Sequence, residues 1–260
     1  MRITVFTSNQ PRHTHLVKLL ASISDTVYCI QECNTVFPGQ VSDFFEKTPV
    51  MREYFERVIA AERALFGDPS FSQSNVRTLS VKAGDLSHLD LETLSPALSA
   101  DIFIVFGASF IKGELIELLV KNNAINIHMG LSPYYRGSSC NFWAMYDRNP
   151  GYVGATIHKL STGLDSGDMF FHCLPKPRKG ESGFMFTMRA VEIAHRALVS
   201  RVSSGQLFQM GAVKQDKDRE IRYTRNLDFQ STVAREFLER PLEMDNCDFE
   251  YPDLLNPFFG

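Results

Sequence analysis

Two short polar clusters in the chain carry side chains that can move protons and stabilise negative charge. Asn126 and His128 are two positions apart at the end of an apolar run, so on a β-strand both would project to the same side. An amide beside an imidazole can donate to an oxyanion, and the imidazole can also transfer a proton. Asp165 lies in the glycine-bounded loop GLDSGD, which can return a carboxylate to the same edge. Together these residues predict acyl transfer to an amine without a covalent enzyme intermediate.

Each cluster also has a structural explanation when it is considered alone. Asn-x-His at a strand end is more often a hydrogen-bonded turn than a catalytic pair, and Asp165 between glycines suits a turn. His13 and His15 resemble half of a metal site, but loop capping near a helix start is favoured and no clear third ligand follows. Cys29 and Cys33 lack a second cysteine pair and are expected in the core and at the surface. No metal is therefore expected.

The segments around these clusters alternate between short apolar runs and helical patterns. This alternation predicts an α/β fold, a Rossmann-like, doubly wound and mostly parallel sheet covered by helices. Strands are expected at 2–6, 26–31, 75–81, 102–106, 124–128, 154–160 and 169–174. Helices are expected at 16–21, 51–66, 112–121, 140–147, 183–204 and 232–240. Ligands bind at the carboxyl ends of strands in such sheets, which is where both polar clusters would fall.

Motifs and composition exclude several classes of protein. The chain has no G-x-G-x-x-G dinucleotide fingerprint, no P-loop and no G-x-S-x-G nucleophile elbow. Its 260 residues include 27 Lys and Arg against 30 Asp and Glu, a net charge of -3 that does not favour nucleic acid. Five scattered cysteines fit a reducing compartment, and neither a signal peptide nor a membrane span is evident. We therefore expect a cytoplasmic protein with no membrane or nucleic-acid partner.

The order and spacing of the two clusters resemble the formyltransferase family that uses N10-formyltetrahydrofolate. The family pattern is a strand ending in Asn-x-His, a turn with Leu and Pro, and an Asp in a glycine-rich loop; it matches Asn126, His128, residues 131–133 and Asp165. The resemblance covers roughly residues 1–205. It implies that Asn126 and protonated His128 hold the oxyanion, while Asp165 stabilises the imidazolium and helps to remove the amine proton.

The same resemblance implies where the two substrates bind. N10-formyltetrahydrofolate would lie across the strand ends, with its pterin between the end of strand 102–106 and the loop 161–167. The residues expected to bind this folate are Phe106, Gly107, Ala108, Ser161, Gly163 and Leu164. The residues expected to bind the acceptor are Asn9, Tyr134, Tyr135, Arg136 and Gly137. Packing of the turn onto the sheet explains Tyr134 and Arg136 equally well, and it is the favoured explanation for Trp143.

The choice of acceptor depends on the C-terminal segment. We expect a catalytic domain over residues 1–208, with a helical insertion at about 41–75 that is atypical of the family, and an extension over 209–260. The last 20 residues hold five acids and no Lys or Arg. This acidic extension is shorter than the tRNA-reading domain of methionyl-tRNA formyltransferase, and its charge opposes a phosphate backbone. The insertion and tail also argue against glycinamide ribonucleotide transformylase.

Segment 128–143 is similar to the sugar-nucleotide N-formyltransferases. This similarity implies that the acceptor is a nucleotide-linked 4-amino-dideoxy sugar for O-antigen synthesis in lipopolysaccharide, with GDP-perosamine as the preferred candidate. A homodimer paired through residues 209–241 is a further expectation. Two alternatives remain open: a formyltransferase for another small amine or for methionyl-tRNA, and a folate- or nucleotide-binding protein without catalysis.

Overall fold

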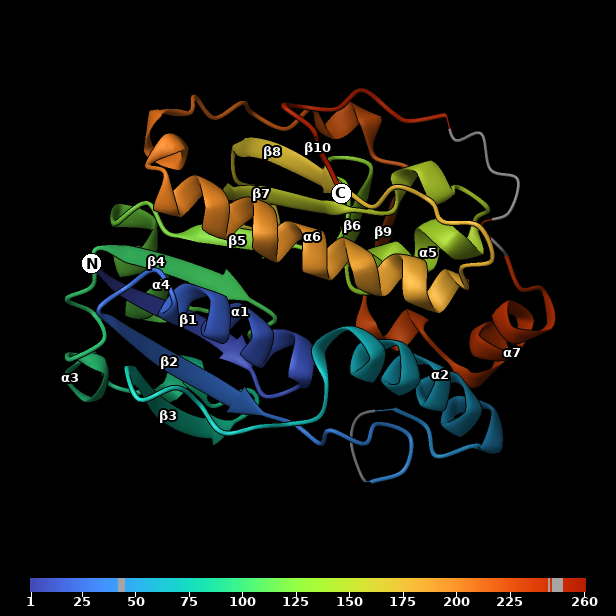
Figure 1. Cartoon of the computed structure of the whole chain (residues 1–260), viewed down its shortest axis with the longest axis horizontal. Helices are drawn as coiled ribbons and strands as arrows, with labels where there is room; N and C mark the ends of the chain where they lie inside the picture. The colour runs from blue at the N-terminus through green and yellow to red at the C-terminus, as the bar shows by residue number, and fades with distance from the viewer. Residues whose placement is uncertain (42–44, 243, 245–249) are drawn as a thin grey trace.

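The computed structural model describes residues 1–41, 45–242, 244 and 250–260 (Figure 1). Its main sheet has eight strands among these residues, in the order β10-β8-β7-β5-β4-β1-β2-β3. The strands are β1 Arg2–Ser8, β2 Thr26–Cys33, β3 Val76–Lys82, β4 Ile102–Phe106, β5 Ile125–His128, β7 Ala155–Lys159, β8 Met169–Leu174 and β10 Phe258–Phe259. Strands β1 to β5 are parallel, whereas β7 is antiparallel to both β5 and β8. The predicted mostly parallel α/β fold is confirmed.

Helices cover both faces of the sheet. They are α1 Pro11–Ala21, α2 Pro49–Phe66, α3 Leu91–Leu94, α4 Gly113–Lys121, α5 Cys140–Tyr146, α6 Gly183–Ser203 and α7 Ser231–Glu239. Short 3-10 turns lie at Leu86–His88, Pro150–Tyr152, Gln206–Gln209, Lys217–Arg219 and Asn226–Asp228. Helices α1 and α6 lie on one face, with α3 and α4 on the other (Figure 1). The sheet is therefore doubly wound.

The central strand β4 shows why the apolar runs form a buried sheet. Ile104 and Phe106 pack with residues of α1 and α6, whereas Phe103 and Val105 pack with residues of α4. Alternate residues of a strand point to opposite faces, so a strand covered by helices on both sides must be apolar throughout. This is the reason that the run IFIVF is the clearest strand signal in the chain.

Helix α1 begins at Pro11, five residues before the predicted start at residue 16. Proline suits the first helical position because its ring presets the helical φ angle and its missing N–H would be unpaired there. The residues that follow Pro11 are polar, so the sequence pattern did not indicate the first turn of this helix. One of these residues, His13, is nevertheless buried. The early start brings the first turn of α1 to the carboxyl end of β1.

The segment after residue 208, the predicted extension, packs against the rest of the chain. Strand β9, Arg222–Thr224, pairs in parallel with β6, Tyr135–Gly137, and β10 adds to the edge of the main sheet beside β8. Gln215, within this segment, is 6% exposed. Sequence patterns did not indicate this packing. The segment is rich in charged residues, and the strand that pairs with β9 lies about ninety residues earlier in the chain.

The predicted insertion at 41–75 contains α2, which packs against α6, α7 and α1. Residues 42–44 of this insertion lie outside the described residues, as do Glu243, Asp245 and Asp248 of the predicted acidic tail. Within the described part of the chain, no helix is long and apolar enough to cross a membrane.

Candidate active site

The structure brings Asn126, His128 and Asp165 together at the carboxyl end of β5. His128 Nδ1 lies 3.4 Å from Asp165 Oδ2, and Asn126 Nδ2 donates to Asp165 Oδ1 at 3.2 Å. The side chains of His128 and Asp165 are only 5% and 12% exposed. The loop between β7 and β8 therefore places its carboxylate where the sequence spacing predicted.

The two ring nitrogens of His128 both face acceptors. Nδ1 faces the Asp165 carboxylate, and Nε2 lies 3.1 Å from the backbone carbonyl oxygen of Tyr135. Both nitrogens can donate only when the ring is an imidazolium. Burial by itself lowers the pKa of His128, but the charge and hydrogen bond of Asp165, together with the neighbouring Cys140, outweigh burial, so the pKa is raised well above its ordinary value. The geometry and the charge balance both favour protonated His128.

Asp165 is the charged partner of this pair. Burial would raise the pKa of its carboxyl group, but His128, His158 and Arg136 together outweigh burial and lower that pKa below its ordinary value. Asp165 is thus a carboxylate and His128 an imidazolium over the same pH range. The site holds a buried ion pair beside a neutral amide.

His158 is a site residue that the sequence interpretation missed. It lies directly opposite Asn126 in the antiparallel pairing of β5 with β7. Its Nδ1 donates to the Lys159 carbonyl at 2.7 Å, which leaves Nε2 to accept from Asn126 Nδ2 at 3.0 Å. Burial lowers the pKa of His158 to about 4, so the ring is neutral. A histidine within the predicted strand 154–160 was the only sequence signal, and its position depends on a register that sequence does not show.

Two further contacts hold the Asp165 loop in place. Asp165 has a φ of +45°, a left-handed conformation that Asp adopts more readily than most residues. Gln215 Nε2 donates to the backbone carbonyls of Asp165 and Gly167, each at 2.8 Å. A Cβ atom at Gly167 would lie 1.7 Å from the Lys159 carbonyl oxygen, so only glycine fits there. Gln215 is a second residue that the sequence interpretation missed.

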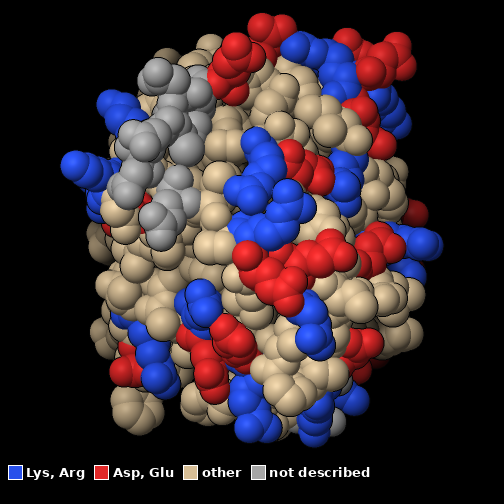
Figure 2. Space-filling model, turned by 90° about the vertical axis from the view of Figure 1, so that its right-hand side faces the viewer, with Lys and Arg blue, Asp and Glu red and all other residues tan. Residues whose placement is uncertain are grey.

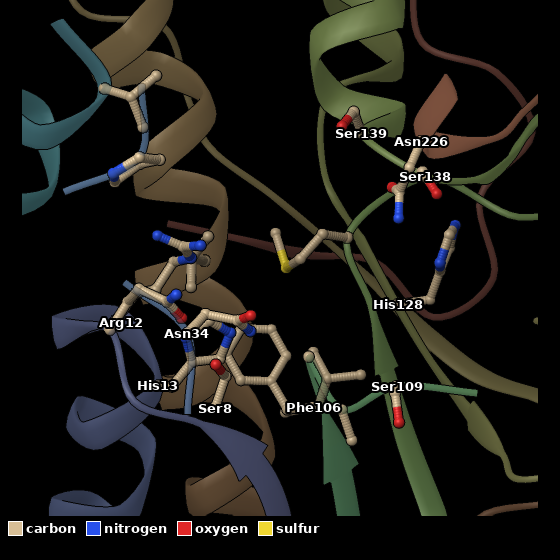
Figure 3. Close-up of a pocket in the computed structure, with 18 of the residues that line it drawn as sticks. Ser8, Arg12, His13, Asn34, Phe106, Ser109, His128, Ser138, Ser139 and Asn226 are labelled. Atoms are coloured by element: carbon tan, nitrogen blue, oxygen red, sulfur yellow. The ribbon is translucent and has the colours of Figure 1, made fainter. Parts of the chain in front are cut away.

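Asn126, His128 and Asp165 line a cavity of about 710 Å³. Figure 3 shows Ser8, Arg12 and His13 on one side of it, with His128, Ser138 and Ser139 on the other. Helix α2, from the predicted insertion, adds Tyr54, Val58 and Glu62 to the wall. Among the described lining residues, those that are Lys, Arg, Asp or Glu are Arg12, Glu62 and Asp165. No cluster of three potential metal ligands occurs among the described residues.

The residues expected to bind folate divide into two groups. Phe106, Gly107, Ala108 and Leu164 line the large cavity. Ser161 and Gly163 do not: the Ser161 hydroxyl donates to the Gly163 carbonyl at 3.0 Å, and this contact closes the loop on itself. These two positions shape the turn that carries Leu164 and Asp165.

Most residues expected to bind the acceptor lie elsewhere. Asn9 bonds the backbone of Asn34 through both ends of its amide. Tyr134 and Tyr135 are 4% and 1% exposed, and their hydroxyls bond the Asp253 carbonyl and the Asp147 carboxylate. These three placements correct the prediction. The rings of Tyr134 and Tyr135 are buried, and the side-chain amide of Asn9 is hydrogen-bonded to the backbone through both of its polar atoms.

Arg136 and Gly137 lie nearer to the site. Arg136 pairs with Glu220 at 2.9 Å and donates to the Leu164 carbonyl at 3.0 Å, so it supports the Asp165 loop without lining the cavity. Gly137 does line the cavity. Trp143 is 4% exposed and stacks under Arg222, as its packing interpretation predicted.

Asn126, His128 and Asp165 lie at the strand ends of a mostly parallel sheet, in the arrangement expected for acyl transfer. Comparison with known families agrees: residues 60–202, more than half of the chain, match the model described as formyl transferase. The chain belongs to the formyl transferase family.

Curated relatives are similar over part of their length. Methionyl-tRNA formyltransferase from Lachnospira eligens is 30% identical over 163 residues, which cover 60% of this chain and 51% of that protein. The enzyme of the same name from Hydrogenovibrio crunogenus is 28% identical over 131 residues, covering 50% and 41%. The matches therefore span about half the length of these relatives.

Solved structures share the fold. A likely sugar N-formyltransferase from Mycobacterium tuberculosis superposes with a TM-score of 0.55 at 15% identity, covering 88% of this chain and 77% of that one. A 4-N formyltransferase from Francisella tularensis gives 0.53 at 16%, with the same coverage. Phosphoribosylglycinamide formyltransferase from Anaplasma phagocytophilum gives 0.52 at 17%, covering 87% and 99%.

Proposed function

We propose that this chain transfers a formyl group from N10-formyltetrahydrofolate to the amino group of a nucleotide-linked amino sugar. The observation that carries the proposal is the convergence of Asn126, protonated His128 and ionised Asp165 on the wall of one cavity. A binding protein without catalysis needs no buried ion pair directed at an amide. Family membership supports formyl transfer as the reaction.

Asn126, His128 and Asp165 have separate roles in that reaction. N10-formyltetrahydrofolate supplies the formyl carbon that the neutral acceptor amine attacks. Asn126 donates a hydrogen bond to the formyl oxygen as negative charge develops on it, and His128 supplies the opposite charge. Asp165 keeps His128 protonated and accepts the proton that the amine loses, directly or through a water. As the bond between the formyl carbon and N10 breaks, that proton passes to N10 and tetrahydrofolate leaves.

The free site is not yet arranged for the oxyanion. Both amide hydrogens of Asn126 are engaged, one with His158 and one with Asp165. The bond to His158 keeps the amide nitrogen directed into the site, so the weaker contact with Asp165 at 3.2 Å is the one to exchange for the formyl oxygen. His158 is on this account a positioning residue for Asn126.

The donor side of the cavity fits a folate ring. Ser109 anchors the loop after β4, because its backbone N–H and its hydroxyl both donate to the buried carboxylate of Glu32. Glu32 also accepts from Gly84, so the loop is tied to the ends of β2 and β3. Phe106, Gly107 and Ala108 precede this anchor, and Leu164 lines the same cavity. A flat pterin ring would lie between these two segments.

Relatives with the same fold support an amino sugar as acceptor. An Anoxybacillus kamchatkensis formyltransferase was solved with UDP-4,6-dideoxy-4-formamido-L-AltNAc and tetrahydrofolate, with a TM-score of 0.50 at 14% identity. A Helicobacter canadensis enzyme was solved with folinic acid and dTDP-3-aminofucose, with a TM-score of 0.52 at 11%. GDP-perosamine, an O-antigen precursor, is our preferred acceptor.

Surface charge supports a small acceptor. Figure 2 shows the face to which the parallel strands point in Figure 1, and basic and acidic side chains are intermixed over it. A phosphate backbone is bound by a continuous basic surface, because affinity depends on the release of counterions by Lys and Arg. Methionyl-tRNA is the second candidate, favoured by the 30% identity to the Lachnospira enzyme. The homodimer through 209–241 stays a prediction.

An acceptor panel tests this function. The protein is supplied with N10-formyltetrahydrofolate and with GDP-, UDP- and dTDP-linked 4-amino sugars or methionyl-tRNA, and tetrahydrofolate release is followed optically. We expect turnover with an amino sugar and a loss of about 100-fold or more in His128→Ala. The control, His88→Ala, changes an exposed histidine and should not alter turnover. Turnover with methionyl-tRNA alone would overturn the choice of acceptor, and near-normal turnover of His128→Ala would overturn the role of His128.

A further inference from the structure

The Nε2 nitrogen of His128, the one that does not face Asp165, has two neighbours that can accept a hydrogen bond. Nε2 lies 3.1 Å from the backbone carbonyl oxygen of Tyr135. Cys140, the first residue of α5, is the second neighbour, and its thiol forms a side-chain hydrogen bond with the imidazole. Different elements therefore hold the two nitrogens of the ring: the Asp165 loop holds Nδ1, while the turn after β5 and α5 hold Nε2.

Gly130 allows these groups to approach one another. A Cβ atom at this position would lie 2.5 Å from Cys140 Cβ, 2.7 Å from His128 Nε2 and 3.0 Å from the Tyr135 carbonyl oxygen, so a larger residue does not fit. Thr156 of β7 fixes the glycine, because its hydroxyl donates to the Gly130 carbonyl at 2.7 Å. Cys140 and His128 thus meet across the α-carbon of Gly130.

The thiol of Cys140 can both donate and accept in this position. Cys140 is 1% exposed and belongs to a buried cluster that includes Leu131 and Phe142. Its Sγ donates to the Gly137 carbonyl oxygen at 3.4 Å. Because that bond uses the thiol proton, the sulfur lone pairs are left to accept from the imidazole N–H. A thiol is a weak acceptor, but an imidazolium is a charged and therefore stronger donor.

Cys140 affects the site only through His128. It is not among the described residues that line the large cavity, so a substrate in that cavity does not touch it. The titratable side chains that face His128 in the described part of the chain are Asp165, Cys140 and His158, whose ring centroid is 6.4 Å away. His158 is neutral, whereas Asp165 and Cys140 both raise the pKa of His128. The carboxylate and the thiol therefore act in the same direction.

We propose that Cys140 is a positioning residue for His128. Its sulfur accepts a hydrogen bond from Nε2–H while its own proton is donated to the Gly137 carbonyl, so the ring keeps both N–H groups and Nδ1 stays against Asp165. No proton is transferred and no bond is broken in this role. The inference rests on the proposed function, in which protonated His128 supplies positive charge to the developing oxyanion. Gly137 lines the large cavity, so the thiol also connects the ring to the cavity wall.

The kinetic test removes the sulfur and then replaces it. In Cys140→Ala we expect kcat to fall about 3- to 10-fold, the factor that corresponds to one hydrogen bond. Both KM values should stay close to normal, because Cys140 does not line the cavity. The basic limb of the pH–rate profile should move to lower pH, because one influence that raises the pKa of His128 is lost. Cys140→Ser supplies a hydroxyl that donates and accepts, and it should restore most of the rate and of the pH profile.

The matched control is Cys173→Ala. Cys173 is also fully buried, but it lies in the core of the main sheet and does not line the large cavity. Each alanine variant removes one buried sulfur, so the two should lose similar amounts of stability in urea denaturation. Only Cys140→Ala should change the pH–rate profile.

A second measurement does not depend on turnover. The ring protons of His128 are followed by NMR through a pH titration, and they are assigned as the histidine signals that are absent from His128→Ala. We expect the midpoint of this titration to be lower in Cys140→Ala than in the unchanged protein. In Cys140→Ser and in Cys173→Ala the midpoint should stay close to that of the unchanged protein.

The outcomes separate the two proposals. An unchanged titration of His128 in Cys140→Ala, or equal effects of Cys140→Ala and Cys173→Ala on the pH–rate profile, overturns the role of Cys140 while formyl transfer stands. A Cys140→Ser variant that behaves like Cys140→Ala overturns the hydrogen bond as the cause. Absence of turnover with every acceptor overturns the proposed function, and the titration then still decides whether Cys140 holds His128.

Discussion

The corner formed by Asn126, His128, His158 and Asp165 and a small cavity of about 280 Å³ between α2, α5, α6 and α7 both include His128, but they are built in opposite ways. In the corner, Asn126, His128, His158 and Asp165 are joined by hydrogen bonds and one ion pair. The small cavity is held largely by ring contacts, and its charged lining residues are Arg12 and the protonated His128 that it shares with the corner. Directional bonds tolerate little displacement, whereas apolar packing adapts to changes of volume.

This difference predicts different kinetic consequences. A change in the corner should reduce kcat, because the charges there act on the reacting atoms. A change in the small cavity, which holds no member of the ion pair except His128, should alter KM more than kcat. The first of the three predictions below changes the ion pair, and the other two change residues that hold the Asp165 loop in place.

Asp165→Asn should have the largest effect. We expect kcat to fall by about 10²- to 10³-fold, because the charge that stabilises the imidazolium is removed. The largest influence that raises the pKa of His128 is then lost, so that pKa falls and the basic limb of the pH–rate profile should move to lower pH. In the unchanged protein that limb lies well above the ordinary histidine pKa, and activity falls on the acidic side only as Asp165 protonates below its ordinary pKa.

The control for this change is Asp168→Asn in the same loop, whose carboxylate makes no hydrogen bond to the described residues. It should leave both the rate and the pH profile unchanged. A pH profile of Asp165→Asn identical to that of the unchanged protein would show that Asp165 does not set the charge of His128.

Gly167→Ala should have the next largest effect. Its Cβ would lie 1.7 Å from the Lys159 carbonyl oxygen, so the Asp165 loop must move away from β7. We expect a loss of about 1–3 kcal/mol in the free energy of unfolding, measured by urea denaturation, and a fall in kcat of about tenfold or more.

Gly163→Ala is the matched control for Gly167→Ala. A Cβ at position 163 approaches the Ser166 hydroxyl, a side-chain atom that can rotate away. Equal losses in the two variants would show that the loop as a whole, and not the contact with Lys159, determines the position of Asp165.

Gln215→Leu should have the smallest effect of the three. It removes two donors to the backbone of the Asp165 loop, each bond contributing about 0.5–1.5 kcal/mol. We expect kcat to fall several-fold while both KM values stay close to normal, as measured by steady-state kinetics. Gln206→Leu, at an exposed position, is the control. A change in acceptor KM alone would place Gln215 with the acceptor site and not with the corner.

The elements and the central site residues could be predicted from the sequence because their signals are local. Strand 102–106 was placed at its observed bounds because a strand buried on both faces must be apolar throughout. Asn126, His128 and Asp165 could be named because a strand repeat of two and a glycine-bounded loop determine which way the side chains point. Tyr134 and Tyr135 were misplaced because residue type does not show whether a ring in a turn faces a ligand or the core.

What the sequence by itself determined was the fold class and the candidate site residues Asn126, His128 and Asp165. The tertiary structure decided the rest: His158 opposite Asn126, Gln215 beneath the Asp165 loop, and a small cavity between α2, α5, α6 and α7. Each of these depends on strand register or on packing between segments far apart in the chain. Such contacts are set by how the whole chain closes around its core, and no local pattern of residues encodes them.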